Sequence, residues 1–316
     1  MGVSSDFKTP AEIDSPFVIV KQCGEFSEVI HLSKLNDNIE PPKRFDSNNF
    51  VNADGELIPI KNHSENRSEN VKSLANTFRN LRDLINCNCL PSSSLWVTLT
   101  YAENMTCTGK LAYDFDIFMK RLKRRYDLKY IAVAEPQARG AWHWHLILMF
   151  PEPDPFIPND VMSELWGHGF TKTVKLSDID NIGAYLTAYL TDAEAKDIPD
   201  SVLSAMPNPE IKEVKTEGGT KKKFIKGGRL WLYPRDFKLF RSSRGLVRPD
   251  KTIYKVVSKS VSPDSLYAEP VSFGDVLEIL ESLGDPTYQL SKNISFDPKQ
   301  KDLTVFKTFY RKEIDG

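Results

Sequence analysis

The amino-acid sequence predicts an α+β fold in which helices cover one side of a mainly antiparallel sheet. Three observations support this prediction. Segments between residues 95 and 176 are rich in β-branched and aromatic residues, as strands are. The stretches around them repeat apolar residues at three- and four-residue steps, as amphipathic helices do. The order strand, helix, strand, strand, helix includes one short link, PQARGA, that suits a hairpin between antiparallel strands.

The individual elements follow from these periodicities. Leu74, Phe78, Leu81 and Ile85 recur on one helical face and predict a helix over 71–85. By the same arguments we expect strands at 95–101, 130–135, 142–150 and 170–176, and helices at 112–126, 159–166 and 179–194.

The chain also divides into regions of different character. Residues 1–70 are expected to form a variable N-terminal region that contains a hairpin within 17–32. Residues 71–250 carry the core pattern, with a polar, Gly- and Lys-rich insertion at 195–228 that we expect to be a mobile loop. Residues 251–316 are expected to form a C-terminal α/β extension with one helix near 274–282.

Composition narrows the function classes. The chain has 316 residues and 40% hydrophobic residues, which is ordinary for a globular protein. No apolar run reaches the ~18 residues of a membrane helix, and the N-terminus lacks the pattern of a secretion signal. The four cysteines form no CxxC pair, so we expect them to be reduced and structural. These features predict a cytoplasmic protein without a membrane partner.

Two histidines and a glutamate predict a metal site. His143 and His145 are two residues apart in a predicted strand, so their side chains share one face. If the hairpin is centred on Arg139, Glu135 lies opposite His143 on the neighbouring strand. Imidazole and carboxylate ligands with open coordination positions suit Mn²⁺ or Mg²⁺. The alternative is that the histidines are outward-facing residues beside a buried core.

Two tyrosines are candidate nucleophiles. Tyr185 and Tyr189 are one turn apart in the predicted helix 179–194, beside an apolar row of Ile182, Leu186 and Leu190. A tyrosine hydroxyl attacks phosphorus poorly unless a cation polarises the phosphate, and the predicted metal site supplies that cation. Taken alone, this spacing is more typical of core or interface packing.

Positive charge is concentrated in one segment although the formal net charge of the chain is only −1. Residues 221–251 contain eleven Lys and Arg residues against two Asp residues, interleaved with aromatic side chains. This mixture is typical of a groove that follows single-stranded nucleic acid. The candidate DNA-binding residues are Arg235, Lys238, Arg241 and Arg244. The alternative is a solvated basic face beside core aromatics.

The three motifs together, in this order, resemble the HUH endonucleases. WVTLTY resembles the first motif of that superfamily, HWH (143–145) the second and YLTAY (185–189) the third. The resemblance covers about residues 70 to 250 and is closest to rolling-circle replication initiators (Rep proteins) of Gram-positive plasmids, phages and integrative elements. It implies a ferredoxin-like or palm-like core with a central five-stranded antiparallel sheet.

The resemblance also implies roles for individual residues. His143, His145 and Glu135 become metal ligands, and Tyr189 becomes the first nucleophile, with Tyr185 acting in a later transfer. One departure stands out. Many relatives carry a lysine after or between the tyrosines, where this chain has Ala188 and Asp192.

The function implied is nicking and rejoining of single-stranded or hairpin origin DNA through a 5′-phosphotyrosyl intermediate. Because no GxxxxGK[ST] motif is present, the chain would depend on a host helicase and polymerase. Relaxases and single-strand transposases of the same superfamily use the same parts, and a DNA-binding replication regulator that does not cleave remains a further alternative.

Overall fold

A computed structural model describes residues 16–24, 26–32, 43–46, 48–52, 54–59, 66–137, 140–176, 182, 190–215, 221–256, 269–283, 286–294 and 303–311. The chain forms two compact units. One consists of residues 63–247, and the other combines residues 1–62 with residues 248–316.

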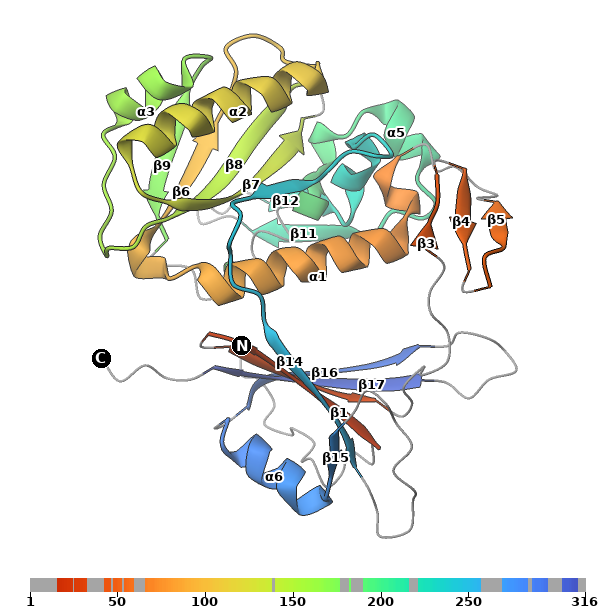
Figure 1. Ribbon diagram of the computed structural model, residues 1–316. Helices are drawn as coiled ribbons and strands as arrows, with labels where there is room; N and C mark the ends of the chain where they lie inside the picture. The colour runs from red at the N-terminus through yellow and green to blue at the C-terminus, as the bar shows by residue number, and fades with distance from the viewer. Residues whose placement is uncertain are drawn as a thin grey trace. The chain divides into compact units, whose positions relative to one another are not determined.

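The unit of residues 63–247 is built on a five-stranded antiparallel sheet (Figure 1). The expected α+β class and the expected five-stranded antiparallel sheet are therefore confirmed. The strands, in spatial order, are β13 (Phe240–Ser242), β7 (Lys129–Pro136), β8 (Trp142–Met149), β6 (Ser94–Leu99) and β9 (Thr171–Lys175).

Strands β7 and β8 lie inside this sheet and are buried on both faces. The period of two along β8 places Trp144 and Leu146 on one face and Ile147 and Met149 on the other. All four side chains are buried, as is typical of a short continuous apolar run in the middle of a sheet. Both faces must therefore be covered by other elements of the chain.

Helices supply that cover on both faces, so the prediction of helices on one side is wrong (Figure 1). α2 (Thr108–Arg125) and α3 (Asn159–Trp166) pack on the Trp144 face. α1 (Val71–Asn88) buries Leu81, Leu84 and Ile85 against the face of Ile147 and Met149. Each fully buried leucine or isoleucine stabilises the fold by about 1.5–3 kcal/mol, so leaving either face bare is costly.

The insertion at 195–228 contains regular structure where we expected a loop. β12 (Lys221–Ile225) pairs with β10 (Ala193–Glu194) and with β11 (Ile211–Lys215). η4 (Ala195–Asp197) and α5 (Asp200–Ala205) precede β11, and η5 (Gly228–Leu232) follows β12. Ile198, Met206 and Ile225 are buried together with Ala193, so this polar segment has a small apolar core of its own.

The second unit joins the two ends of the chain in one six-stranded sheet. The hairpin expected within 17–32 is confirmed, because β1 (Phe17–Cys23) pairs with β2 (Phe26–Leu32). β1 also pairs with β14 (Asp250–Val256), and β2 pairs with β17 (Leu303–Arg311). The edge strands are β15 (Glu269–Val271) and β16 (Pro286–Ile294).

Smaller elements complete the described residues. The helix expected near 274–282 is confirmed as α6 (Phe273–Glu281), whose first turn is closed by a capping box between Ser272 and Asp275. β3 (Lys43–Arg44), β4 (Asn49–Val51) and β5 (Leu57–Pro59) form a separate three-stranded sheet. None of the helices in the described ranges is long and apolar enough to cross a membrane.

Candidate functional site

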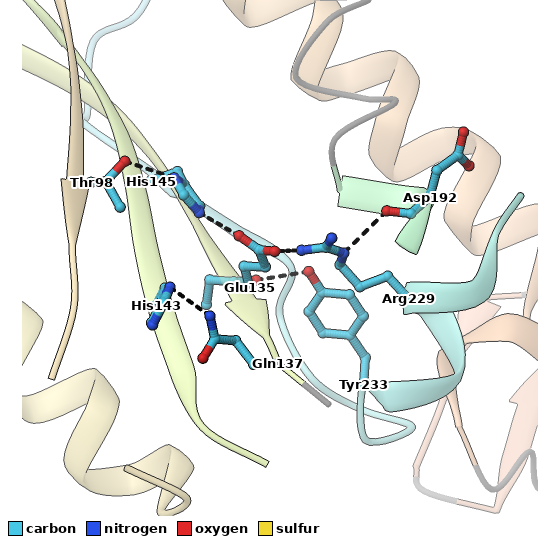
Figure 2. A network of polar contacts seen from close by, with 9 residues as sticks. Thr98, Glu135, Gln137, His143, His145, Asp192, Arg229 and Tyr233 are labelled. Atoms are coloured by element: carbon cyan, nitrogen blue, oxygen red, sulfur yellow. Dashed lines mark hydrogen bonds and ion pairs between the residues drawn. The ribbon is translucent and has the colours of Figure 1, made fainter. Parts of the chain in front are cut away.

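The β7–β8 hairpin brings the predicted metal ligands together on one face of the sheet. Glu135 lies directly opposite His143, so the register predicted from the sequence is confirmed. The imidazole of His145 contacts the carboxylate of Glu135, which reaches it from the neighbouring strand (Figure 2). Two of the three predicted ligands therefore already touch.

His145 is fixed in one orientation and one tautomer. Its side chain is only 3% exposed, between the ring of Trp96 and the carboxylate of Glu135. A carboxylate can only accept, so the Nε2–H of His145 donates to Glu135. Nδ1 then accepts from the hydroxyl of Thr98 at 3.2 Å. Burial lowers the pKa of His145 to about 4, so the imidazole is neutral at pH 7, the form that binds metals.

His143 lies two residues earlier on the same face and is less enclosed. It is half-buried, and its Nδ1 accepts a hydrogen bond of 3.2 Å from the side-chain amide of Gln137. Gln137 lies just beyond the end of β7, so the hairpin itself orients this imidazole (Figure 2). Of the two candidate metal ligands, His145 is therefore held rigidly, and His143 lies nearer to solvent.

Glu135 has a second partner that the sequence does not indicate. The guanidinium of Arg229, in η5, forms an ion pair with its carboxylate. The Nε–H of Arg229 also donates to the backbone carbonyl of Asp192 at 3.3 Å. Burial lowers the pKa of Arg229, but a guanidinium remains charged throughout the physiological range. Figure 2 shows Glu135 between the imidazole of His145 and this guanidinium.

A pocket of about 240 Å³ opens beside this ion pair. Glu135 and Arg229 supply its charged groups together with Asp197, and Gln137 lines it as well. Behind Glu135, the hydroxyl of Tyr233 donates to the carbonyl of Ala134 at 2.8 Å and ties the chain after η5 to β7. A carboxylate and a guanidinium therefore line a pocket that has space for a ligand.

The candidate nucleophiles Tyr185 and Tyr189 lie outside the described residues. Their neighbours Ile182 and Leu190 are helical and buried, as the predicted apolar row requires. Both pack in the cluster that contains Ile147, which is on the same face of β8 as the two histidines. The helical residues end at Thr191, and the chain enters β10 at 193, so the helix predicted to 194 ends earlier.

The metal-binding fit can be judged from the donor set. A neutral imidazole and a carboxylate in contact are ligands that Mn²⁺ or Mg²⁺ accepts. His143 lies opposite that carboxylate in the strand register. Within the described part of the chain, however, no three His, Cys, Asp or Glu side chains are arranged as a metal-binding group. The residue types therefore suit Mn²⁺ or Mg²⁺, but Glu135 would have to give up its present partners to bind the ion.

The predicted DNA-binding residues gather mostly on the other face of the sheet. Arg235, Lys238 and Arg241 line a pocket of about 530 Å³ together with Trp144, which faces α2. Arg241 pairs with Asp116 at 2.8 Å and lies over the ring of Trp144. The exposed Arg244 does not line this pocket. Three of the four candidates are therefore brought together, and the fourth is not.

Arg229 directly follows a turn made by two glycines, Gly227 and Gly228. Gly227 has φ of +70°, a conformation that favours glycine, and its N–H donates to the carboxylate of Asp192 at 3.0 Å. A Cβ on Gly228 would lie 3.1 Å from Ile225. The dipeptide GG before Arg229 was the only signal in the sequence, and it does not identify Glu135 or Asp192 as partners.

One of three comparisons with known proteins gave a match. Residues 94–194 match the family model of Replication-associated protein ORF2/G2P. The matched segment begins with β6 and includes the β7–β8 hairpin, and it supports a relation to replication proteins of the Rep type. No curated protein and no solved structure matches the chain.

Proposed function

We propose that the chain is a metal-dependent DNA nickase and strand transferase that initiates rolling-circle replication, with a palm-like core of the HUH type. One observation carries the proposal. Glu135 lies opposite His143 and touches His145, on the face against which both flanks of the tyrosine segment pack. The match to a replication-associated family over the same residues supports it.

The chemistry follows from the residue types. When bound, Mn²⁺ or Mg²⁺ supplies positive charge that polarises the scissile phosphate. His143, His145 and Glu135 would hold the ion. Tyr189 loses its proton and attacks phosphorus in line, so that a tyrosyl O–P bond forms while the P–O3′ bond breaks. The 3′-oxygen leaves and takes up a proton, and the 5′ end stays on the protein.

Rejoining is the reverse of this exchange. The phosphotyrosyl ester retains the energy of the phosphodiester, so an incoming 3′-OH can displace the tyrosine without a nucleotide cofactor. Tyr185 would act in this later transfer. The partners under this proposal are single-stranded or hairpin origin DNA, which the basic residues near Trp144 would contact, and a host helicase and polymerase.

A covalent adduct is the decisive test. Labelled single-stranded oligonucleotides tiling the DNA that flanks the gene would be incubated with the protein and Mn²⁺ and run on denaturing gels. We expect one oligonucleotide to give a protein-linked band that disappears with EDTA. Tyr189→Phe should remove most of the band, and Tyr185→Phe should mainly impair transfer to a second strand.

The controls separate the alternatives. Tyr113, an exposed tyrosine on α2, is the matched control, and Tyr113→Phe should leave the adduct unchanged. Full adduct yield from the double variant Tyr185→Phe, Tyr189→Phe would place the nucleophile elsewhere. Specific binding of one oligonucleotide without any adduct would instead favour a DNA-binding replication regulator that does not cleave.

A further inference from the structure

Arg229 links two segments that are far apart in the chain. Its guanidinium NH1 pairs with Glu135 on β7, and its Nε–H donates to the carbonyl of Asp192. Asp192 also accepts the N–H of Gly227 through its side chain, so two hydrogen bonds fasten the η5 turn to the chain just beyond the tyrosine segment. Arg229 is thus anchored at the residue that follows the helical Thr191.

The environment of Arg229 is unusual for a cation. Its side chain is 11% exposed and that of Glu135 is 8% exposed. Removing a charge from water costs several kcal/mol unless a partner of opposite charge is close, so each of these groups depends on the other. The pocket of about 240 Å³ nevertheless opens on both groups. A buried ion pair that lines a pocket can exchange partners when a charged ligand enters.

The carboxylate of Glu135 cannot bind Arg229, His145 and a metal ion at the same time with full strength. The guanidinium of Arg229 and the imidazole of His145 already engage its carboxylate. A divalent cation held by Glu135 would bind the same oxygens and would repel the guanidinium. The ion and Arg229 are therefore competitors for one carboxylate. A displaced Arg229 remains beside the pocket because its Nε–H still donates to the carbonyl of Asp192.

We infer that Arg229 is the phosphate-binding cation of this site, and that it stays paired with Glu135 until a divalent metal ion binds that carboxylate. This inference rests on the proposed function. Once displaced, the guanidinium faces the pocket, where its planar donors suit the two non-bridging oxygens of a phosphodiester. Metal binding and phosphate binding are then coupled, and the site becomes competent for DNA only when the metal has arrived.

The charges support this arrangement. A divalent ion, one carboxylate, one guanidinium and two neutral imidazoles sum to about two positive charges. Attack of a tyrosinate on a phosphodiester places two negative charges at the reacting phosphorus. Without Arg229 the same site would carry only one positive charge, so the arginine should matter more as negative charge builds up than for binding of the DNA strand.

A merely structural role for Arg229 makes the opposite prediction for the metal. If Arg229 only braced Glu135, its removal would weaken metal binding by roughly 10–100-fold, as loss of an outer partner of a metal ligand does. If Arg229 competes with the metal, its removal should tighten metal binding. The direction of the change in Mn²⁺ affinity therefore separates the two roles.

The test uses the full chain and the variants Arg229→Gln and Arg229→Lys. Mn²⁺ affinity is measured by calorimetry without DNA, and nicking is measured at saturating Mn²⁺ on the oligonucleotide that gives the adduct. We expect Arg229→Gln to bind Mn²⁺ roughly fivefold more tightly or better. Its nicking rate should fall on the order of 100-fold. Arg229→Lys should recover part of the rate, because it restores the charge without the planar donors.

Arg125 offers a matched control, because it forms an exposed pair with Glu164 at 3.1 Å. Arg125→Gln should change neither Mn²⁺ affinity nor nicking. Weaker Mn²⁺ binding by Arg229→Gln, or an unchanged nicking rate, would overturn the inference while the proposed function stands. A wild-type chain that neither binds Mn²⁺ nor forms the adduct would overturn the proposed function and the inference with it.

Discussion

His143 and His145 share a face of β8, but they have different surroundings. His145 is enclosed by Trp96, Thr98 and Glu135, whereas His143 is half-buried and bonded to Gln137 within its own hairpin. Truncating His145 leaves a cavity and removes one partner from a buried carboxylate. Truncating His143 removes the hydrogen bond to Gln137 from a half-buried position. The two residues can therefore have one role in the chemistry and different roles in the stability of the fold.

We predict that His143→Ala and His145→Ala both abolish nicking, because each removes a metal ligand. Only His145→Ala should also lower the free energy of unfolding, by roughly 1–3 kcal/mol, since it leaves buried polar groups without a partner. Urea denaturation and the adduct assay measure the two effects. Nicking at the wild-type rate in Mn²⁺ by either variant would show that the metal assignment is wrong.

The residues of the candidate site were predictable to different degrees. The position of Glu135 followed from hairpin symmetry, because both ligand strands are adjacent in sequence. Arg229 and Asp192 were not predicted, since their contacts depend on how the insertion folds back onto β7. Local periodicity carries no information about such distant pairs, and an arginine in a basic segment resembles its exposed neighbours.

At the level of elements, the basic segment is not one uniform surface. Lys222 and Lys223, on β12, pair with Glu194 and Glu213. Arg235, Lys238 and Arg241 instead line the pocket beside Trp144. Much of the excess charge that the sequence shows is therefore balanced locally, since Arg235 and Arg241 also pair with Asp236 and Asp116. What distinguishes the residues after η5 is that they line a pocket together with aromatic side chains.

We predict that the four candidate DNA-binding residues, three of which line this pocket, set the salt dependence of DNA binding. Each phosphate neutralised should contribute about −0.7 to the log-log slope of single-strand affinity against salt. Replacing Arg235, Lys238, Arg241 and Arg244 with Gln should flatten the slope, as measured by fluorescence anisotropy with the labelled oligonucleotide. Replacing Lys222 and Lys223 should leave it unchanged. An unaltered slope in the fourfold variant would show that DNA binds elsewhere.

The elements themselves were predicted well where one signal dominated. The strands of the hairpin and helices α1, α2 and α3 lie where the periodicity placed them, within a few residues. The side on which α1 packs was not predicted, because an apolar stripe shows that a helix is buried and does not show against which face. The strands at 211–215 and 221–225 were missed because lysines interrupt their apolar residues.

At the scale of the whole molecule, the two units differ in how the chain builds them. Residues 63–247 are continuous, whereas the other unit depends on pairing between the two ends of the chain. Nothing in the sequence joins residues 1–70 to residues 251–316, since pairing between strands so far apart leaves no local signal. All five tryptophans, at 96, 142, 144, 166 and 231, fall in the continuous unit, so tryptophan fluorescence reports on that unit alone.

His31 allows the stability of the other unit to be tested separately. Its side chain is buried in β2, opposite the buried Val18, and burial lowers its pKa to about 4. The folded unit therefore holds the neutral imidazole, whereas the unfolded chain takes up a proton near pH 6.5. The stability that His31 contributes by being neutral is fully present above pH 6.5. It is lost as the pH falls toward 4, by up to roughly 3 kcal/mol.

We predict that His31→Leu removes this loss from the unit that contains β1 and β2. Urea transitions would be followed between pH 7.5 and 4.5 by circular dichroism, which detects both units, and by tryptophan fluorescence, which detects only residues 63–247. The variant should flatten the pH dependence of the transition seen by circular dichroism and leave the fluorescence transition as in wild type. His168→Asn, in the other unit, serves as the control. If His31→Leu keeps the full pH dependence, the buried imidazole is not its source, and a shifted fluorescence transition would show that the units unfold together.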